Sequence, residues 1–303
     1  MHGYVTSVDW EWYSTVRSIA EVDETNLWRP GIRQQFRALD PGEPVFFRLK
    51  SPRDRIAGFG FFTHFSIFPV SLAWRIFTKR TGASSRRELH DRVLQLRSQL
   101  GMETEPADLS DPDLGCILLR NCIMLDNEDW LDPPEDFDDR AGHGKLYDLS
   151  IGEGKRLWSS ACRQASDIAV DPESARSSLL STARYGPRSF RVAVFDAWGR
   201  RCAVTGEGVA TALDAARFAP DIPGAYSLSN GILLRADLAY LLEAGYITIT
   251  PDHVLRVSSS VQQSETGRDY HRWHGTGIRL PEDPSIRPDP ELLWLHQKKQ
   301  FIG

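Results

Sequence analysis

Five arginines stand within eighteen residues of the C-terminal half, against Asp196 as the only acid. They are Arg184, Arg188, Arg191, Arg200 and Arg201. Guanidinium groups match phosphate oxygens in a bidentate geometry, so the cluster predicts a surface that holds a nucleic-acid backbone. The alternative is that these arginines pair with the acidic run 126–139, in which eight of fourteen residues are Asp or Glu.

Histidines and cysteines give weaker signals. His271 and His274 flank Trp273, but an H-x-x-H pair without a partner acid or cysteine is weak evidence for zinc. Cys202 has no CxxC partner, so we expect it to be packed in the interior. The chain has four cysteines, and their low number predicts a reduced, cytoplasmic compartment.

Length and composition limit the architecture that must position these residues. A chain of 303 residues predicts two domains, which we place at 1–170 and 184–303 with a Ser-rich linker at 171–183. The net charge of −5 argues against a nonspecific coat for nucleic acid but allows a local basic groove. No apolar run approaches the ~18 residues that cross a bilayer, and no secretory signal opens the chain, so we expect no membrane partner.

Apolar patterns and turn residues indicate an α+β fold. In the first half they predict strands at 44–49, 56–62 and 115–124 and helices at 72–78, 85–100 and 154–165, the second helix opening on a Ser85…Glu88 capping box. The acidic run 126–139 is expected to be a solvated loop. In the second half they predict a helix at 190–198, a hairpin strand at 201–205, apolar segments at 213–219 and 232–234, a helix at 236–243 and a closing hairpin of 246–250 with 253–257.

The second half carries an ordered series of motifs. They are RCAVTG at 201–206, LDAA at 213–216, NGILLRADL at 230–238, GYIT at 245–248, GRDY at 267–270 and IRLP at 278–281. This series resembles the HNH endonuclease family, in the branch found in restriction enzymes, over roughly 184–303. The resemblance implies a ββα-metal finger. In such a finger one histidine is the general base, an asparagine orients it, and a second histidine binds a divalent cation.

This chain departs from that motif at the residues that matter most. The resemblance places the general base at Arg217 and the metal histidine at Ala239, and only Asn230 stays as the motif requires. A guanidinium does not accept a proton near neutral pH and repels a divalent cation, and alanine offers no ligand atom. We therefore expect that the metal-dependent nuclease site has been lost or altered and that no cofactor is bound.

Two alternatives stay open. Asp214, Asp237 and Glu243 lie near the correct elements, and their oxygens would hold Mg²⁺ in a rebuilt, active modification-dependent endonuclease. Otherwise they are ordinary surface carboxylates. The divergent finger would equally suit recruitment to another ligand or reaction.

The first half carries a second resemblance. The motifs WRP at 28–30, FRAL at 36–39, PGEP at 41–44, GFGFF at 58–62 and LYDL at 146–149 look like the PUA/SRA-like β-barrel that accompanies such nucleases and reads modified bases. The resemblance implies a base pocket at Trp28, Arg29 and Phe36. Aromatics such as Phe59, Phe61 and Phe65, at alternating strand positions, are expected to be core.

The hypothesis is thus a DNA-binding protein of the HNH restriction-endonuclease family, with DNA, plain or modified, as its partner. Arg217 is expected to grip the backbone, unless it turns outward to pair with Asp214 or Asp221. The sequence leaves open which base is read, whether any cleavage survives, which metal a rebuilt site would take and whether the protein is a homodimer.

Overall fold

The computed structural model describes residues 1–31, 36–102, 109–138, 144–167, 173–174, 176–177, 184–264 and 268–303. The chain divides into two compact units, Met1–Ser189 and Phe190–Gly303. Most of the predicted linker, 171–183, lies outside the described residues. The boundary between the units falls within a helix, α6 (Pro187–Ala197), and lies later in the chain than we expected.

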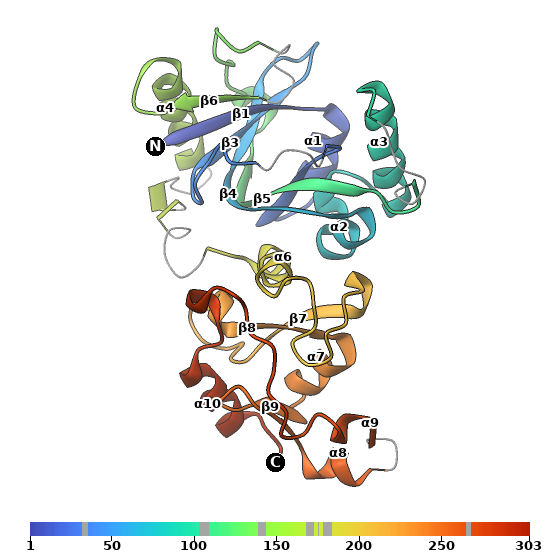
Figure 1. Ribbon diagram of the computed structural model, residues 1–303. Helices are drawn as coiled ribbons and strands as arrows, with labels where there is room; N and C mark the ends of the chain where they lie inside the picture. The colour runs from blue at the N-terminus through green and yellow to red at the C-terminus, as the bar shows by residue number, and fades with distance from the viewer. Residues whose placement is uncertain are drawn as a thin grey trace. The chain divides into compact units, whose positions relative to one another are not determined.

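A mixed sheet in the order β2-β5-β4-β3-β1-β6 is the centre of the N-terminal unit (Figure 1). Its strands are β1 (His2–Val8), β2 (Glu24–Arg29), β3 (Pro44–Leu49), β4 (Ile56–Pro69), β5 (Asp113–Met124) and β6 (Lys145–Asp148). β1 and β3 run parallel and every other pair is antiparallel. Among the described residues β2 and β6 end the sheet and do not pair with each other, so the strands form an open sheet where we expected a barrel.

The α-helices α1 (Trp10–Arg17), α2 (Val70–Phe77), α3 (Arg86–Gln99) and α4 (Gly152–Asp167) accompany this sheet in the described part of the unit. Figure 1 shows α4 near β6, with α2 and α3 on the other side of the unit. The predicted capping box is formed in part. Ser85 Oγ accepts from the Glu88 N–H at 3.1 Å, but the Glu88 carboxylate accepts from Ser84 N–H at 2.9 Å instead of closing on Ser85.

The core of the N-terminal unit is aromatic. Phe46, Phe59 and Phe61 are fully buried and surround Trp158 of α4 at ring-centroid distances of 6.3–6.5 Å. Phe59 and Phe61 are core residues, as the alternation of their positions predicted, whereas Phe65 is only half-buried.

The sequence predicted that the acidic run is a solvated loop, but part of this run packs into the core. It contains a short 3-10 helix (Asn127–Asp129), and Leu131 is 8% exposed within the apolar core. The N–H groups of Leu131 and Ile56 each donate to the other's carbonyl at 2.9 Å. We call residues 126–138 the acidic segment. Leu131 and these two backbone hydrogen bonds hold the segment on the sheet, and Trp130 and Phe137 pack against the same core.

The C-terminal unit contains a strand–strand–helix unit. β7 (Leu213–Arg217) pairs antiparallel with β8 (Gly231–Arg235), and α7 (Ala236–Glu243) follows without a loop and packs on both strands. The predicted elements at these positions are therefore present. The predicted hairpin strand at 201–205 is a turn instead, closed by Gly206 N–H donating to Cys202 O at 3.0 Å.

The rest of the unit comprises β9 (Ile247–Ile249), β10 (Leu255–Val257), α8 (Ser259–Gln263), α9 (Arg268–His271) and α10 (Pro290–Lys299). β9 and β10 form the predicted closing hairpin. Within the part of the chain that the structure describes, no helix combines the length and the apolar character needed to cross a membrane.

Candidate functional site

The strand–strand–helix unit contains all three motif positions. Arg217 is the last residue of β7 and lies opposite Gly231, the first residue of β8. Asn230 immediately precedes β8, and Ala239 lies on α7, which packs on β7. The antiparallel register therefore places Arg217 and Gly231 side by side at the two ends of the connection 218–230, and α7 packs on both strands.

The side chain of Asn230 is fully buried and holds the connection 218–230 through hydrogen bonds to its backbone. Its Nδ2 group donates to Ala219 O and Ala225 O, each at 2.8 Å, and its Oδ1 accepts from Ala219 N–H at 2.9 Å. Both N–H donors of the amide are used on backbone carbonyls. In this chain the asparagine shapes the loop, whereas the resemblance implied that it would orient a catalytic histidine or a metal.

Arg217 lies half-buried over the ring of Tyr226, with its guanidinium carbon 4.6 Å from the ring centroid. One N–H of Nη1 donates to Pro220 O at 3.3 Å. The expected alternative, pairing with Asp214 or Asp221, is wrong. Asp214 pairs with Arg191, and among the described residues no carboxylate pairs with Arg217. A guanidinium has five N–H donors, so most of them are available to a ligand.

The carboxylates proposed for a rebuilt metal site do not converge. Asp214 is taken by Arg191, and Glu243 is exposed. Asp237 accepts from Arg235 Nε and Nη2 at 2.7 and 2.6 Å.

The hydrogen bonds from Arg235 hold the pKa of Asp237 below its usual value, and the Tyr270 hydroxyl at 2.9 Å acts in the same direction. Ala239 is buried and offers no ligand. In the described ranges no three His, Cys, Asp or Glu side chains lie close enough to hold a metal ion. The residues present therefore do not fit the divalent cation that the resemblance implies.

The five clustered arginines do not share one surface of the C-terminal unit. Two of them lie in the N-terminal unit, before the boundary: Arg184 donates to Thr63 O at 3.0 Å, and Arg188 lies 3.5 Å from Asp23 and 3.8 Å from Glu24. The other three contact neighbours in their own unit, namely Arg191 with Asp214, Arg200 with Asp196 at 3.0 Å, and Arg201 with Gly206 O at 3.2 Å. Each of the five arginines thus already has a partner in the described part of the chain.

The predicted base-pocket residues separate into two groups. Trp28 is 9% exposed, and its indole N–H donates to Thr81 O at 2.9 Å. Neighbouring residues of a strand point to opposite faces, so Arg29 faces away from Trp28. The Arg29 guanidinium lies 5.3 Å from the Phe36 ring centroid and 5.6 Å from that of Tyr4. The structure brings Arg29 and Phe36 together and leaves Trp28 in the core.

His271, His274 and Cys202 make structural contacts. The rings of His271 and His274 stack at 6.4 Å, and His274 Nδ1 accepts from the Val257 N–H at 3.1 Å. Cys202 is fully buried, as predicted, and its sulfur accepts from the N–H groups of Thr205 and Arg235 at 3.4 and 3.2 Å.

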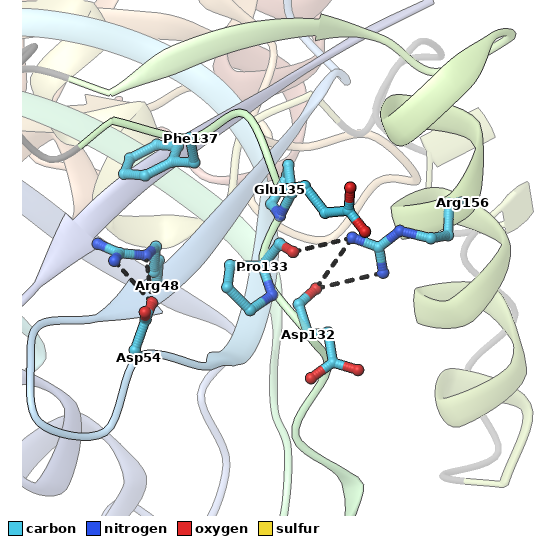
Figure 2. Close-up of a pocket in the computed structure, with 8 residues that line it drawn as sticks. Arg48, Asp54, Asp132, Pro133, Glu135, Phe137 and Arg156 are labelled. Atoms are coloured by element: carbon cyan, nitrogen blue, oxygen red, sulfur yellow. Dashed lines mark hydrogen bonds and ion pairs between the residues drawn. The ribbon is translucent and has the colours of Figure 1, made fainter.

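Sequence reasoning did not anticipate a cavity in the N-terminal unit. Its volume is about 510 Å³, and it is lined by Arg48, Asp54, Asp132, Pro133, Pro134, Glu135, Phe137 and Arg156. Figure 2 shows Arg48 with Asp54 on one side of the acidic segment and Arg156 on the other. The acidic residues and the Pro133-Pro134 pair were visible in the sequence, but their arginine neighbours come from distant positions.

Comparisons with known proteins give distant similarities. No protein-family model and no curated protein sequence matches the chain. The structure is similar to ASCH from Zymomonas mobilis, at 18% identity over 52% of this chain and 94% of that chain, with a TM-score of 0.32. It is also similar to a modification-dependent TagI restriction endonuclease, at 11% identity over 98% of this chain and 81% of that chain, with a TM-score of 0.31. Similarities of this size leave the family and the activity to be argued from the residues of this chain.

Proposed function

We propose that this protein binds DNA and that its C-terminal strand–strand–helix unit is an HNH-like ββα finger that grips the phosphate backbone without metal-dependent hydrolysis. The observation that carries the proposal is Arg217. It stands at the motif position of the general base, with a planar cation held against Tyr226, and among the described residues only Pro220 O accepts a hydrogen bond from it.

The chemistry of the guanidinium supports a backbone contact. It stays charged throughout the physiological range, desolvates more easily than an ammonium, and presents paired N–H groups that match two phosphate oxygens. The ring of Tyr226 holds the group flat and so lowers the entropy lost on binding. In this proposal Arg217 supplies the positive charge that a cation supplies in an active finger.

Hydrolysis is not part of the proposal because the residues for it are missing. No proton acceptor occupies position 217, position 239 has no ligand atom, and Asp214 and Asp237 are each paired with an arginine. An assay on plain and modified plasmid with Mg²⁺, Mn²⁺ or Zn²⁺ tests this directly. Metal-dependent cleavage by the purified protein that Asp237→Asn abolishes would establish the alternative, a rebuilt endonuclease.

For the N-terminal unit we propose a PUA/SRA-like role in contacting a base, modified or plain. Arg29 and Phe36 support it, because a guanidinium and a ring at 5.3 Å offer planes for stacking. Trp28 is no longer a candidate, since its ring is buried and its N–H is bonded to the backbone.

Titration of a short DNA duplex with the Arg217→Ala protein tests the central claim. We expect a loss of about 1–3 kcal/mol of binding free energy, the range of a charge-assisted contact. Arg256→Ala is the matched control, because Arg256 is an exposed arginine of β10 in the same unit and its removal changes the net charge equally. If both variants bind as tightly as the parent at low salt, Arg217 does not contact DNA and the proposal fails.

A further inference from the structure

Arg97, in the last turn of α3, is a buried cation that has no part in the sites described above. It is 4% exposed, its Nε–H donates to Pro30 O at 3.0 Å, and an N–H of Nη2 donates to Asp113 O. Among the described residues no carboxylate pairs with it. Burying a cation without a counter-charge costs free energy, so stability alone gives no reason for a charged side chain at this position.

The two carbonyls that Arg97 binds belong to the two strands of the β2–β5 pair. Arg29 and Gly115 are the last paired residues at this end of the ladder. Pro30 follows Arg29 directly, and Asp113 is the first residue of β5. Nε and Nη2 lie on the same edge of a guanidinium, so one rigid fork bridges the two strands just beyond their last pair.

Pro30 makes this bridge important for Arg29. A proline has no N–H, so its carbonyl is the one backbone group through which it forms a hydrogen bond. That carbonyl is taken by Arg97. Arg29, the residue before it, directs its guanidinium to the Tyr4 hydroxyl at 2.9 Å and lies over the ring of Phe36. Arg97 thus fixes the backbone immediately after the arginine that we propose as a base contact.

Gly115 supports the same stretch of chain. A Cβ at this position would lie 3.1 Å from Gly31 O and 3.2 Å from two ring carbons of Phe65. The glycine therefore lets the backbone after Pro30 and the Phe65 ring approach each other closely. Phe65 in turn packs on Phe36, with their ring centroids 6.4 Å apart. The backbone that carries Arg29 and the ring of Phe36 accordingly share one support.

We propose that Arg97 is a positioning residue for the base contact of Arg29 and Phe36, an inference that rests on the function proposed for the N-terminal unit. Its fork keeps the end of β2 against β5, so the guanidinium of Arg29 and the ring of Phe36 hold their spacing of 5.3 Å before a base arrives. A base that stacks on preformed planes loses less free energy to the ordering of side chains. Arg97 is buried and touches no base itself.

A double-mutant cycle on the full chain tests this. The ligand is a short single-stranded DNA oligonucleotide, whose unpaired bases are open to stacking, and every protein carries Arg217→Ala so that the proposed finger contact does not contribute. We expect Arg29→Ala to weaken binding about tenfold and Arg97→Met roughly three- to fivefold. In the Arg29→Ala protein, Arg97→Met should cause no further loss, because the two residues act through one contact.

Three further variants separate position from charge and from stability. Arg87→Met removes the same charge from the same helix at a side chain that is 92% exposed, and it should bind as its parent does. Arg97→Lys keeps the charge but lacks the fork, so it should lose affinity as Arg97→Met does. Gly115→Ala crowds the support with Arg97 intact, and its loss should also vanish in the Arg29→Ala protein. If thermal unfolding shows that Arg97→Met does not fold, Gly115→Ala takes its place in the cycle.

The outcomes distinguish this inference from the function on which it rests. If Arg29→Ala binds the oligonucleotide as tightly as its parent, the base contact is absent and the role of Arg97 falls with it. If Arg29→Ala weakens binding but the loss from Arg97→Met is additive, the base contact stands and Arg97 is not its positioning residue. Parental binding by Arg97→Lys together with weak binding by Arg97→Met would assign the effect to charge and overturn the role of the fork.

Discussion

The two ends of the β7–β8 hairpin each carry an arginine, in opposite circumstances. At one end Arg235, opposite Leu213, donates to both carboxylate oxygens of Asp237 and lies 5.2 Å from the ring of Trp273. At the other end Arg217, opposite Gly231, has a tyrosine ring and one carbonyl. Both are half-buried cations of the same small sheet, but within the described part of the chain a carboxylate pairs with Arg235 and none pairs with Arg217.

The difference shows that the number of arginines in a sequence does not give the charge available to a ligand. Asp237, the second residue of α7, pairs with Arg235, which lies two residues earlier in the chain. Asp214 lies close to Arg217 in the sequence, but it pairs with Arg191 of α6 instead. Whether the N–H donors of an arginine are available to a ligand depends on which carboxylates lie against it in the folded protein. The hairpin therefore has one structural end and one end with free donors.

The largest effect on stability is expected from a substitution in the loop at the end of the hairpin that carries Arg217. Asn230→Ala removes three hydrogen bonds to buried backbone groups of Ala219 and Ala225, and those groups find no replacement. We expect the free energy of unfolding to fall by on the order of 3 kcal/mol, measured by urea unfolding. DNA affinity should fall as well, because the same connection carries Tyr226.

Ser229→Ala is the control for that change. Among the described residues its hydroxyl has one hydrogen-bond partner, the Ser227 hydroxyl at 3.3 Å, so the loss should stay within ~0.5 kcal/mol. An Asn230→Ala protein as stable as Ser229→Ala would show that the asparagine does not hold the loop.

A smaller effect is expected at the Arg235 end. Arg235→Ala should cost about 1 kcal/mol of stability, the upper range for a partly exposed pair, and should leave DNA affinity unchanged. Because Arg235 lowers the pKa of Asp237, the pair stabilises the fold above the ordinary pKa near ~3.9, and this stabilisation is lost as the pH falls through the lower, folded value.

The Arg235→Ala protein should therefore show a weaker loss of stability on acidification than its parent. Urea unfolding at a series of pH values measures this difference. If Arg235→Ala weakens DNA binding as strongly as Arg217→Ala does, the distinction between the two ends of the hairpin is wrong.

Helices and strands whose apolar residues form clear runs or recur at a regular spacing were predictable from the sequence. β3 matches its predicted range, and β7, β8 and α7 follow the apolar runs around 213–219, 232–234 and 236–243. The turn at 201–205 was missed because a short apolar run is equally compatible with a strand.

Side-chain partners were not predictable, because distant segments supply them. The acidic segment owes its place to Leu131 packing on a sheet formed elsewhere in the chain. His296 was unremarked in the sequence, yet it is 1% exposed, and its burial lowers its pKa. Asn230 was identified by resemblance, but its bonds to Ala219 and Ala225 depend on how the loop closes.

The smallest expected effect sharpens the comparison at the Arg217 end. Tyr226 lies beneath the guanidinium and also packs against Phe190 at 5.6 Å. Tyr226→Leu keeps apolar bulk against Phe190 but removes the ring face that orients Arg217. A cation–π contact at a partly exposed site is worth about 0.5–1 kcal/mol, so DNA affinity should fall by roughly two- to fivefold.

Tyr226→Phe separates the ring from the hydroxyl. Phenylalanine retains the face under Arg217 and the edge contact with Phe190, and among the described residues no hydrogen bond uses the Tyr226 hydroxyl. DNA titrations of both variants should therefore show weaker binding for Tyr226→Leu and parental binding for Tyr226→Phe. Equal losses would assign the effect to a hydroxyl contact with DNA. Parental binding by both would mean that Arg217 needs no platform, and the two ends of the hairpin would then differ only in the presence of a carboxylate.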